Sequence, residues 1–253
     1  MRYVVWAFDY SHASTGPKVL HRLCHELNQI GQEAYVGPWI TNPAWDTPVW
    51  TDPLDDAIAV YPEIVRGNPW NAPKVVRWVL NTPGRLGGDT SYDPAEMVFT
   101  YSPLFTDAPL LYLPAAETDI YTDRHLPRSG ALVWVGKGRR TKTVEGREIT
   151  YEERLDRYLL ADALNRAEVM YSFDTMSGMT DLARLCGCPV VVIPDGAFTR
   201  DDYDRAIGWD GIGWDEPPAP WDPDEFRALY LGLMDEFHQQ LARFVDVTQG
   251  VLV

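Results

Sequence analysis

The stretch RYVVWAFDYSHASTGPKVLHRLCHELNQIGQEAYVGPW, residues 2–39, decides the fold because a strand, a loop, a helix and a second strand follow one another in it. Residues 2–9 are mostly apolar and rich in β-branched and aromatic side chains, which predicts a buried strand. Pro17 suits the first turn of a helix, apolar residues then recur at helical spacing, and Gly31 fits a C-cap. A second strand at 33–39 completes a βαβ unit, which is normally right-handed with parallel strands.

Beyond this unit the first half of the chain continues with further apolar segments separated by turns. A Pro- and Trp-rich connector follows the second strand, and a turn-rich stretch without clear period closes the half. We expect that stretch, residues 116–129, to link two domains. Between the connector and the linker, the predicted elements are strands at 57–65, 96–102 and 110–116 and a short helix at 72–84, with Pro73 near its start and Thr-Pro-Gly at its end.

After residue 129 the alternation of strands and helices starts again. Thr150 and Glu153 stand in capping-box spacing at the start of one helix, and Asp222 and Pro223 suit the N-cap and first position of a long terminal helix. The sequence therefore predicts an α/β fold with two α/β halves followed by one helix. The predicted elements of the second half are strands at 131–136, 168–173 and 189–196 and helices at 150–167, 179–187 and 222–245.

The composition of the 253-residue chain is that of a soluble globular protein, since 45% of the residues are hydrophobic and 23% are charged. Its net charge of −15 argues against nonspecific nucleic-acid binding, which depends on Lys and Arg neutralising phosphates. No window is apolar for long enough to span a membrane, and residues 1–9 are too short and too soon acidic for a signal peptide. Cys24, Cys186 and Cys188 form neither a disulfide framework nor a zinc motif, so we expect packed thiols and a cytoplasmic location.

The first candidate site is the loop between the first strand and the first helix, DYSHASTGPK at 9–18. Doubly wound sheets bind ligands beyond the carboxyl ends of their strands, and this loop occupies such a position. Asp9 and His12 are candidate acid, base or orienting groups, and Gly16 would let the backbone approach a ligand closely. The same residues also fit an ordinary capped loop. Because neither G-x-G-x-x-G nor G-x-x-x-x-G-K-[ST] is present, no hydride-transfer cofactor site and no kinase-type phosphate loop is predicted.

The second candidate is GKGRRTKTVEGR, residues 136–147, which gathers five cations in an acidic protein. Lys137 and Arg139 follow a predicted strand and stand among glycines. Lysine binds phosphate as a point charge, and arginine can bind it in a bidentate manner, so the segment fits a phosphate site. Read in isolation, it fits a turn with solvated cations equally well.

The third candidate is the loop in SFDTMSGMTD, residues 172–181, where a strand is followed by a helix. Free N–H groups and a partial positive charge at helix N-termini hold phosphates. Asp181 would accept hydrogen bonds from ribose hydroxyls or would favour the helix dipole, and Asp174 would cap the loop. The predicted ligands of a diphosphate are the N–H groups and hydroxyls of Ser177, Gly178, Met179 and Thr180.

The chain resembles GT-B-type glycosyltransferases over most of its length. The resemblance lies in four segments that follow in the same order, at 10–36, 61–84, 132–138 and 171–196. In that family two Rossmann-like domains face each other across a cleft. The amino-terminal domain holds the acceptor, the carboxyl-terminal domain holds the nucleotide sugar, and a last helix often crosses back onto the first domain. The domains that the resemblance implies are an acceptor domain at 1–115, a nucleotide-sugar domain at 130–221 and a returning helix at 222–253.

The resemblance also implies roles for the candidate residues. Gly16 would face the donor phosphates from the acceptor side, and Lys137 would neutralise the diphosphate leaving group. Asp181 would hold the ribose and stands where the family more often has glutamate, while Asp174 occupies part of the region of the family's paired-glutamate pattern. The N–H groups of the 177–180 segment would bind the diphosphate.

The expected reaction moves a sugar from a nucleotide diphosphate sugar to a hydroxyl acceptor, a glycan or similar. A UDP-sugar is the expected donor, and no metal ion or other cofactor is expected. Fixed N–H donors and cations would stabilise the charge that builds on the leaving phosphate. Asp9, His12 and Glu63 are the candidate bases because all lie at loop ends of the first half. Glu63 also fits a structural partner of Arg66 or Arg77.

Two other functions stay open. In one, a phage-type DNA glycosyltransferase acts on a hydroxylated base, with residues 136–147 gripping the DNA backbone. In the other, the chain is a catalytically dead protein that binds a nucleotide sugar without transferring it. Salt-sensitive duplex binding and turnover of a labelled donor distinguish these functions from the first.

Overall fold

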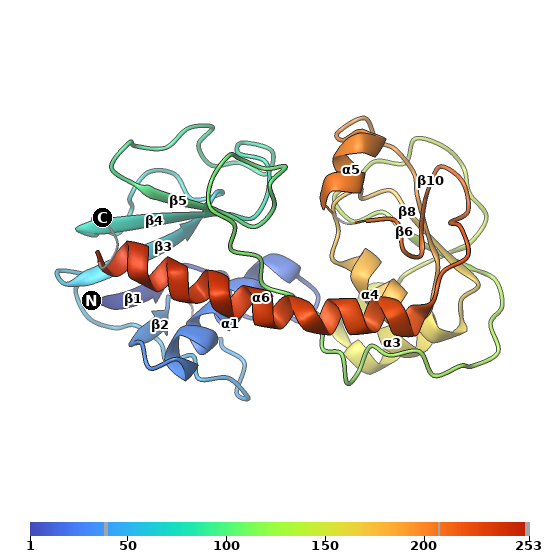
Figure 1. The fold of residues 1–253 in the computed structure, drawn as a ribbon, viewed down its shortest axis with the longest axis horizontal. Helices are drawn as coiled ribbons and strands as arrows, with labels where there is room; N and C mark the ends of the chain where they lie inside the picture. The colour runs from blue at the N-terminus through green and yellow to red at the C-terminus, as the bar shows by residue number, and fades with distance from the viewer. Residues whose placement is uncertain (38–39, 207, 251–253) are drawn as a thin grey trace. The chain divides into compact units, whose positions relative to one another are not determined.

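A computed structural model describes residues 1–37, 40–206 and 208–250 of the chain (Figure 1). The chain forms two compact units, each built on a parallel five-stranded sheet. The first contains Met1–Pro114 together with the chain from Leu233 onward, and the second contains Ala115–Gly232. The predicted linker at 116–129 lies in the second unit. The prediction of an α/β fold is confirmed.

The sheet of the first unit has the strand order β2-β1-β3-β4-β5, with every neighbouring pair parallel. Helix α1 (Thr15–Gln29) connects β1 to β2 and packs against both, so the predicted βαβ unit is confirmed. The last two residues of the strand predicted at 33–39 lie outside the described residues. The strands are β1 (Arg2–Val5), β2 (Ala34–Val36), β3 (Ala57–Pro62), β4 (Lys74–Val79) and β5 (Met97–Thr100).

The helix predicted at 72–84 is wrong, because this segment forms strand β4. Pro73 and the Thr-Pro-Gly stop are also compatible with the ends of a strand. Between them, Val75, Val76 and Val79 are β-branched, and all three are buried between β3 and β5. The tertiary position in the middle of the sheet therefore decides the structure of a segment whose flanking residues suit either element.

The strand predicted at 110–116 is also wrong, since only Leu110 pairs, in an isolated bridge with Thr100. Leu111 and Leu113 are fully buried, so the apolar pattern reports burial rather than a hydrogen-bonded ladder. Pro109 and Pro114 bound the segment and lack the N–H groups that a strand would donate.

The sheet of the second unit has the order β10-β9-β8-β6-β7, again with all neighbours parallel. Two strands and one helix were not predicted from the sequence: β7, β10 and α5. All three are short, and none shows a clear hydrophobic period. The elements of this sheet and its helices are β6 (Ala131–Trp134), β7 (Arg147–Glu148), α2 (Tyr151–Leu155), α3 (Arg157–Arg166), β8 (Val169–Ser172), α4 (Met179–Leu185), β9 (Val190–Val192), α5 (Arg200–Ala206) and β10 (Ile212–Trp214).

The helix predicted at 150–167 is interrupted at Asp156, whose backbone is extended and separates α2 from α3. The carboxylate of Asp156 accepts the N–H groups of Tyr158 and Leu159, at 2.9 and 3.2 Å, so this residue caps the second helix. The capping box of Thr150 and Glu153 at the start of α2 is confirmed. Aspartate favours helix caps over helix interiors because its side chain forms hydrogen bonds with nearby backbone groups in non-helical conformations. This preference explains the break.

Helix α6 (Pro223–Gln249) begins at the predicted proline and continues four residues beyond the predicted end. The carboxylate of Asp222 accepts the N–H of Asp224 at 2.8 Å, as expected of an N-cap. Residues up to Gly232 belong to the second unit, where Tyr230 accepts the N–H of Ala116. Later residues belong to the first unit, where Phe237, Leu241 and Phe244 are fully buried. Within the described residues, no helix is both long and apolar enough to cross a bilayer.

Candidate functional site

The loop after β6 lies directly against the connection between β8 and α4, at the carboxyl end of the second sheet. A Cβ atom added at Gly138 would lie 1.7 Å from the carbonyl oxygen of Phe173, and one added at Gly136 would lie 2.4 Å from the Asp174 carboxylate. Gly136 also has a φ of +53°, which favours glycine. The two glycines therefore permit a close approach that no larger residue allows.

Two hydrogen bonds join these loops. The backbone N–H of Lys137 donates to the Asp174 carboxylate at 3.0 Å, and the Trp134 indole N–H donates to the Ser177 hydroxyl at 3.0 Å. Asp174 is only 3% exposed, so its bond to Lys137 is shielded from water. The structure thus brings Lys137, Asp174 and Ser177, three of the predicted donor-binding residues, to one place at the sheet edge.

Part of the predicted diphosphate site, residues 177–180, already makes hydrogen bonds within its own turn. The N–H of Met179 donates to the Ser177 hydroxyl at 3.2 Å, and both the N–H and the hydroxyl of Thr180 donate to the Ser177 carbonyl. The N–H groups of Met176, Ser177 and Gly178 are half-buried and have no acceptor among the described residues. Of the four predicted amides, those of Ser177 and Gly178 have no acceptor among the described residues and those of Met179 and Thr180 are used within the turn, while Met176 adds one free amide that was not predicted. The free amides are the donors that an anion would find.

Asp181, the predicted ribose ligand, lies in the first turn of α4 and accepts a hydrogen bond from Arg184 at 2.6 Å. Arg184 is 2% exposed, and its guanidinium lies 4.0 Å from the centre of the Phe226 ring. One oxygen of the Asp181 carboxylate is therefore held by a buried cation. This arrangement fixes the position of the side chain.

The cations of residues 136–147 do not form a uniform basic surface. Arg140 pairs with Glu148, Lys142 with Asp215 and Arg147 with Glu153. Lys137 and Arg139 are exposed and make no ion pair within the part of the chain that the structure describes. Of the five positive charges in this segment, two are available to a ligand without breaking a pair.

In the first unit, Asp9, His12 and Gly16 lie in or next to the loop between β1 and α1. The Asp9 carboxylate accepts the N–H of Ile40 at 3.0 Å, and His12 Nδ1 lies 3.2 Å from the Tyr10 hydroxyl. Gly16 is inside the first turn of α1, and a Cβ added there would have no atom within 4 Å. The described structure therefore leaves space for a larger side chain at position 16.

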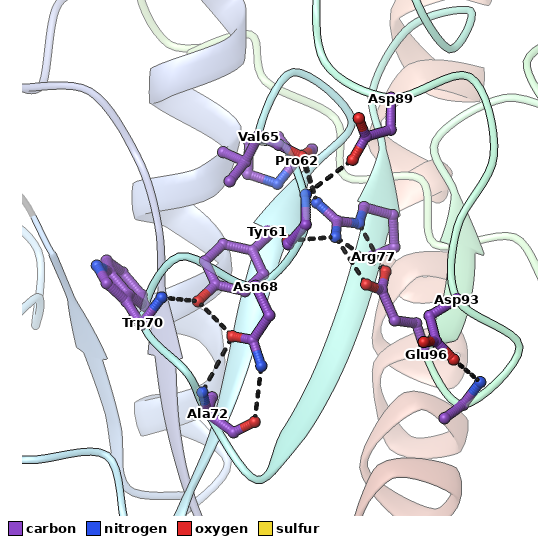
Figure 2. Close-up of polar contacts among 12 residues, drawn as sticks. Tyr61, Pro62, Val65, Asn68, Trp70, Ala72, Arg77, Asp89, Asp93 and Glu96 are labelled. Atoms are coloured by element: carbon purple, nitrogen blue, oxygen red, sulfur yellow. Dashed lines mark hydrogen bonds and ion pairs between the residues drawn. The ribbon is translucent and has the colours of Figure 1, made fainter.

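Glu63 follows β3 and is buried, with its carboxylate accepting the N–H of Leu80 at 2.9 Å. Its neighbour Gly88 has a φ of +79°, and a Cβ there would lie 2.0 Å from the Glu63 carbonyl oxygen. Arg77, one of the partners considered for Glu63, instead forms a bidentate pair with Glu96 (Figure 2). The Glu63 turn is held by main-chain packing and by the Arg77 network rather than by an Arg77–Glu63 ion pair.

The Arg77 side chain is fully buried, and it organises the loop that follows β3. Its guanidinium donates to the carbonyl oxygens of Val65 at 2.7 Å, Gly67 at 2.9 Å and Pro62 at 3.5 Å, besides the Glu96 carboxylate. The Tyr61 and Tyr92 rings lie 5.3 and 5.0 Å from it. Burial raises the pKa values of both tyrosines to about 12, so both remain neutral at physiological pH.

Comparison with known proteins leaves the function of this site open. No known family model matches the chain, and no curated protein matches it either. Among solved structures, an uncharacterized protein from Klebsiella pneumoniae is 11% identical, with 80% of this chain and 86% of that one covered at a TM-score of 0.43. The glycotransferase of kitacinnamycin is 12% identical, with 98% and 95% covered at a TM-score of 0.39. Neither likeness is close enough to decide what this chain does.

Arg154 is a cation near the donor loops that sequence reasoning missed. Its guanidinium lies 5.2 Å from the centre of the Trp134 ring, and the same indole donates to Ser177. Arg154 makes no ion pair among the described residues, and its buried Nε atom has no hydrogen-bond partner. Trp134 and Arg154 are twenty positions apart and meet only in the folded chain, so no local pattern could have indicated the contact.

His21 is a buried histidine that sequence reasoning also missed. Its Nε2 atom lies 3.0 Å from the Phe8 carbonyl oxygen and donates to it, while Nδ1 has no partner in the described structure. Burial lowers the pKa of His21, so the ring is neutral at physiological pH. It fixes the start of the loop that carries Asp9 and His12.

The three cysteines are fully buried free thiols, as predicted. Burial raises the pKa values of Cys186 and Cys188 to about 12, which makes them unreactive packing groups. No group of three or more His, Cys, Asp or Glu side chains in the described ranges is arranged to hold a metal ion.

Proposed function

We propose that this chain transfers a sugar from a nucleotide diphosphate sugar, with a UDP-sugar as the expected donor, to a hydroxyl acceptor. One observation carries the proposal: the close contact of the glycine loop with the β8–α4 connection. In this contact the backbone N–H of Lys137 donates to Asp174, close in sequence to Met176, Ser177 and Gly178, whose amides have no acceptor among the described residues; the Lys137 side chain makes no ion pair within the same residues. Fixed amides with an adjacent cation suit a diphosphate, and the order of motifs that resembles GT-B enzymes supports the same assignment.

In the proposed reaction, the acceptor oxygen forms a bond to the anomeric carbon while the bond from that carbon to the leaving phosphate oxygen breaks. The electron pair of the broken bond stays on the nucleoside diphosphate. Lys137 and the amides stabilise this charge, and their geometry is fixed before the reaction. The acceptor proton would pass to Asp9, His12 or Glu63 of the first unit, or to water. The cations supply the compensating charge, so the proposal includes no metal ion.

The distribution of charge supports the proposal of a glycan or similar acceptor rather than DNA. Three of the five cations in 136–147 are already paired with carboxylates. The first unit, which would hold the acceptor, has eight Lys and Arg against fifteen Asp and Glu, a net charge of −7. DNA binding depends on neutralising phosphates, and this surface offers too few cations for that.

A thermal-shift screen with UDP, GDP, dTDP, CMP and their sugars tests the donor site. A ligand of the native state at one hundred times its Kd stabilises the protein by about 2.7 kcal/mol, so one nucleotide should clearly raise the melting temperature. Lys137→Ala should weaken that nucleotide roughly tenfold to a hundredfold, because a charge-assisted contact contributes about 1.5–3 kcal/mol.

Lys142→Ala is the matched control, since Lys142 is an exposed lysine of the same loop that is already paired with Asp215. It should keep most of the shift. A Lys137→Ala variant that keeps the full shift would show that the donor site lies elsewhere. Binding without release of labelled sugar to any acceptor or to water would instead favour a protein that only binds the nucleotide sugar.

A further inference from the structure

Ser177 carries a hydroxyl whose proton has no acceptor among the described residues. The hydroxyl oxygen accepts two hydrogen bonds, from the Trp134 indole N–H at 3.0 Å and from the Met179 N–H at 3.2 Å. Because a hydroxyl has two acceptor lone pairs and one proton, these bonds occupy both lone pairs. The proton must then donate to something else, and no residue in the described ranges takes it. Ser177 is half-buried, so part of it is open to solvent.

The other hydroxyls of this connection are already used. Three of them donate to oxygen atoms of the protein itself, and these are the hydroxyls of Ser172, Thr175 and Thr180. Ser177 therefore adds a fourth donor to the free N–H groups of Met176, Ser177 and Gly178. Four donors on three successive residues suit an oxyanion such as a phosphate. The carboxylate of Asp174, a near neighbour in sequence, accepts the N–H of Lys137.

Trp134, at the end of β6, is held from several sides. Its N–H donates to Ser177, and the Arg154 guanidinium lies 5.2 Å from the centre of its ring. The loop that follows β6 packs against the same end of the indole, since a Cβ atom added at Gly136 would lie 2.7 Å from the indole nitrogen. The direction of the indole N–H is therefore set by the fold, and through it the direction of the Ser177 hydroxyl is set as well.

We propose that Trp134 is a positioning residue of the donor site. Its N–H occupies one lone pair of the Ser177 oxygen, so that the hydroxyl proton points at a phosphate oxygen of the leaving nucleoside diphosphate. The hydroxyl then donates to the negative charge that builds on that group, and no reorientation is needed at the moment of reaction. This role rests on the proposed function, because it takes the diphosphate to lie at the β8–α4 connection. Trp134 acts through Ser177.

Isothermal titration with UDP, GDP and dTDP tests this role in the full chain. Ser177→Ala removes the donor and should weaken the nucleotide that binds by roughly tenfold to a hundredfold, as expected for a hydrogen bond to a charged group. Trp134→Phe keeps a ring beside Arg154 and removes only the N–H. It should weaken binding about threefold to tenfold, since the hydroxyl must then be ordered by the ligand. In the Ser177→Ala background, Trp134→Phe should cost less than about twofold more.

Trp78→Phe is the matched control, because it removes an indole hydrogen bond of the same length, 3.0 Å to the Leu111 carbonyl, in the first unit. It should leave nucleotide affinity unchanged. Full affinity in Trp134→Phe or Ser177→Ala would overturn the positioning role. An effect of Trp134→Phe that persists undiminished in the Ser177→Ala background would also overturn it, because Trp134 would then act on stability rather than through the hydroxyl. A wild type that binds none of the three nucleotides overturns the proposed function as well.

Discussion

Arg77→Met is expected to destabilise the first unit by about 3–5 kcal/mol, which is the cost of breaking a buried ion pair by removing one partner. The variant would leave the Glu96 carboxylate, which is 9% exposed, without its bidentate partner. It would also leave the carbonyl oxygens of Pro62, Val65 and Gly67 without their donors (Figure 2). Urea denaturation followed by circular dichroism measures the loss.

Two further variants separate the causes. Arg77→Lys should recover only part of the stability, because an ammonium group has three donors and lacks the planar fork of the guanidinium. Arg200→Met is the control for an exposed pair: Arg200 and Glu216 are 3.6 Å apart and both more than half exposed, so its effect should stay below about 1 kcal/mol. Equal effects of Arg77→Met and Arg200→Met would contradict the structural role of the network.

Gly138→Ala is expected to have the largest effect on the donor site. Its new Cβ would collide with the Phe173 carbonyl oxygen at 1.7 Å, so the loop must move away from the β8–α4 connection. The hydrogen bond from the Lys137 N–H to Asp174 would then be lost, and the glycine loop would no longer be held against this connection. We expect nucleotide affinity to fall at least about tenfold, since a misplacement of one ångström has large consequences in a preorganised site.

Gly232→Ala is the natural comparison, because a Cβ at Gly232 would have no atom within 4 Å and the residue lies inside α6. Its stability should stay unchanged or rise, by up to roughly 1 kcal/mol, since alanine is the better helix former. Isothermal titration of both variants with the nucleotide from the screen measures the difference. If Gly138→Ala binds as tightly as the wild type, the close contact of the two loops does not build the site.

The sequence predicts best where local pattern and tertiary position agree. The unit β1–α1–β2 follows from apolar periodicity, Pro17 and Gly31, and the start of α6 follows from Asp222 and Pro223. The prediction fails at β4, where Pro73 and a Thr-Pro-Gly stop suit a helix and only the neighbouring strands select an extended chain. The two-residue strand β7 forms because β6 is beside it, and no period could reveal it.

The candidate site shows the same limit. The positions of Lys137 and Ser177 at strand ends were readable from turns and glycines, because the carboxyl ends of parallel strands meet at one edge. The sequence could not show which amides of residues 177–180 already have acceptors, because this depends on how Ser177 and Thr180 close their own turn. Two contacts join residues about twenty positions apart, and only the folded chain brings these groups together. They are the Arg154 guanidinium over the Trp134 ring and the ion pair of Arg77 with Glu96.

The central claim is that a nucleoside diphosphate binds at the carboxyl edge of the second sheet, between the glycine loop and the β8–α4 connection. A titration of isotope-labelled protein with the nucleotide from the screen, followed by amide chemical shifts, tests it most directly. The account predicts saturable shifts of the Ser177, Gly178 and Gly138 amides, with Gly31 at the end of α1 unchanged. Saturable binding that leaves the Ser177, Gly178 and Gly138 amides unmoved would contradict it.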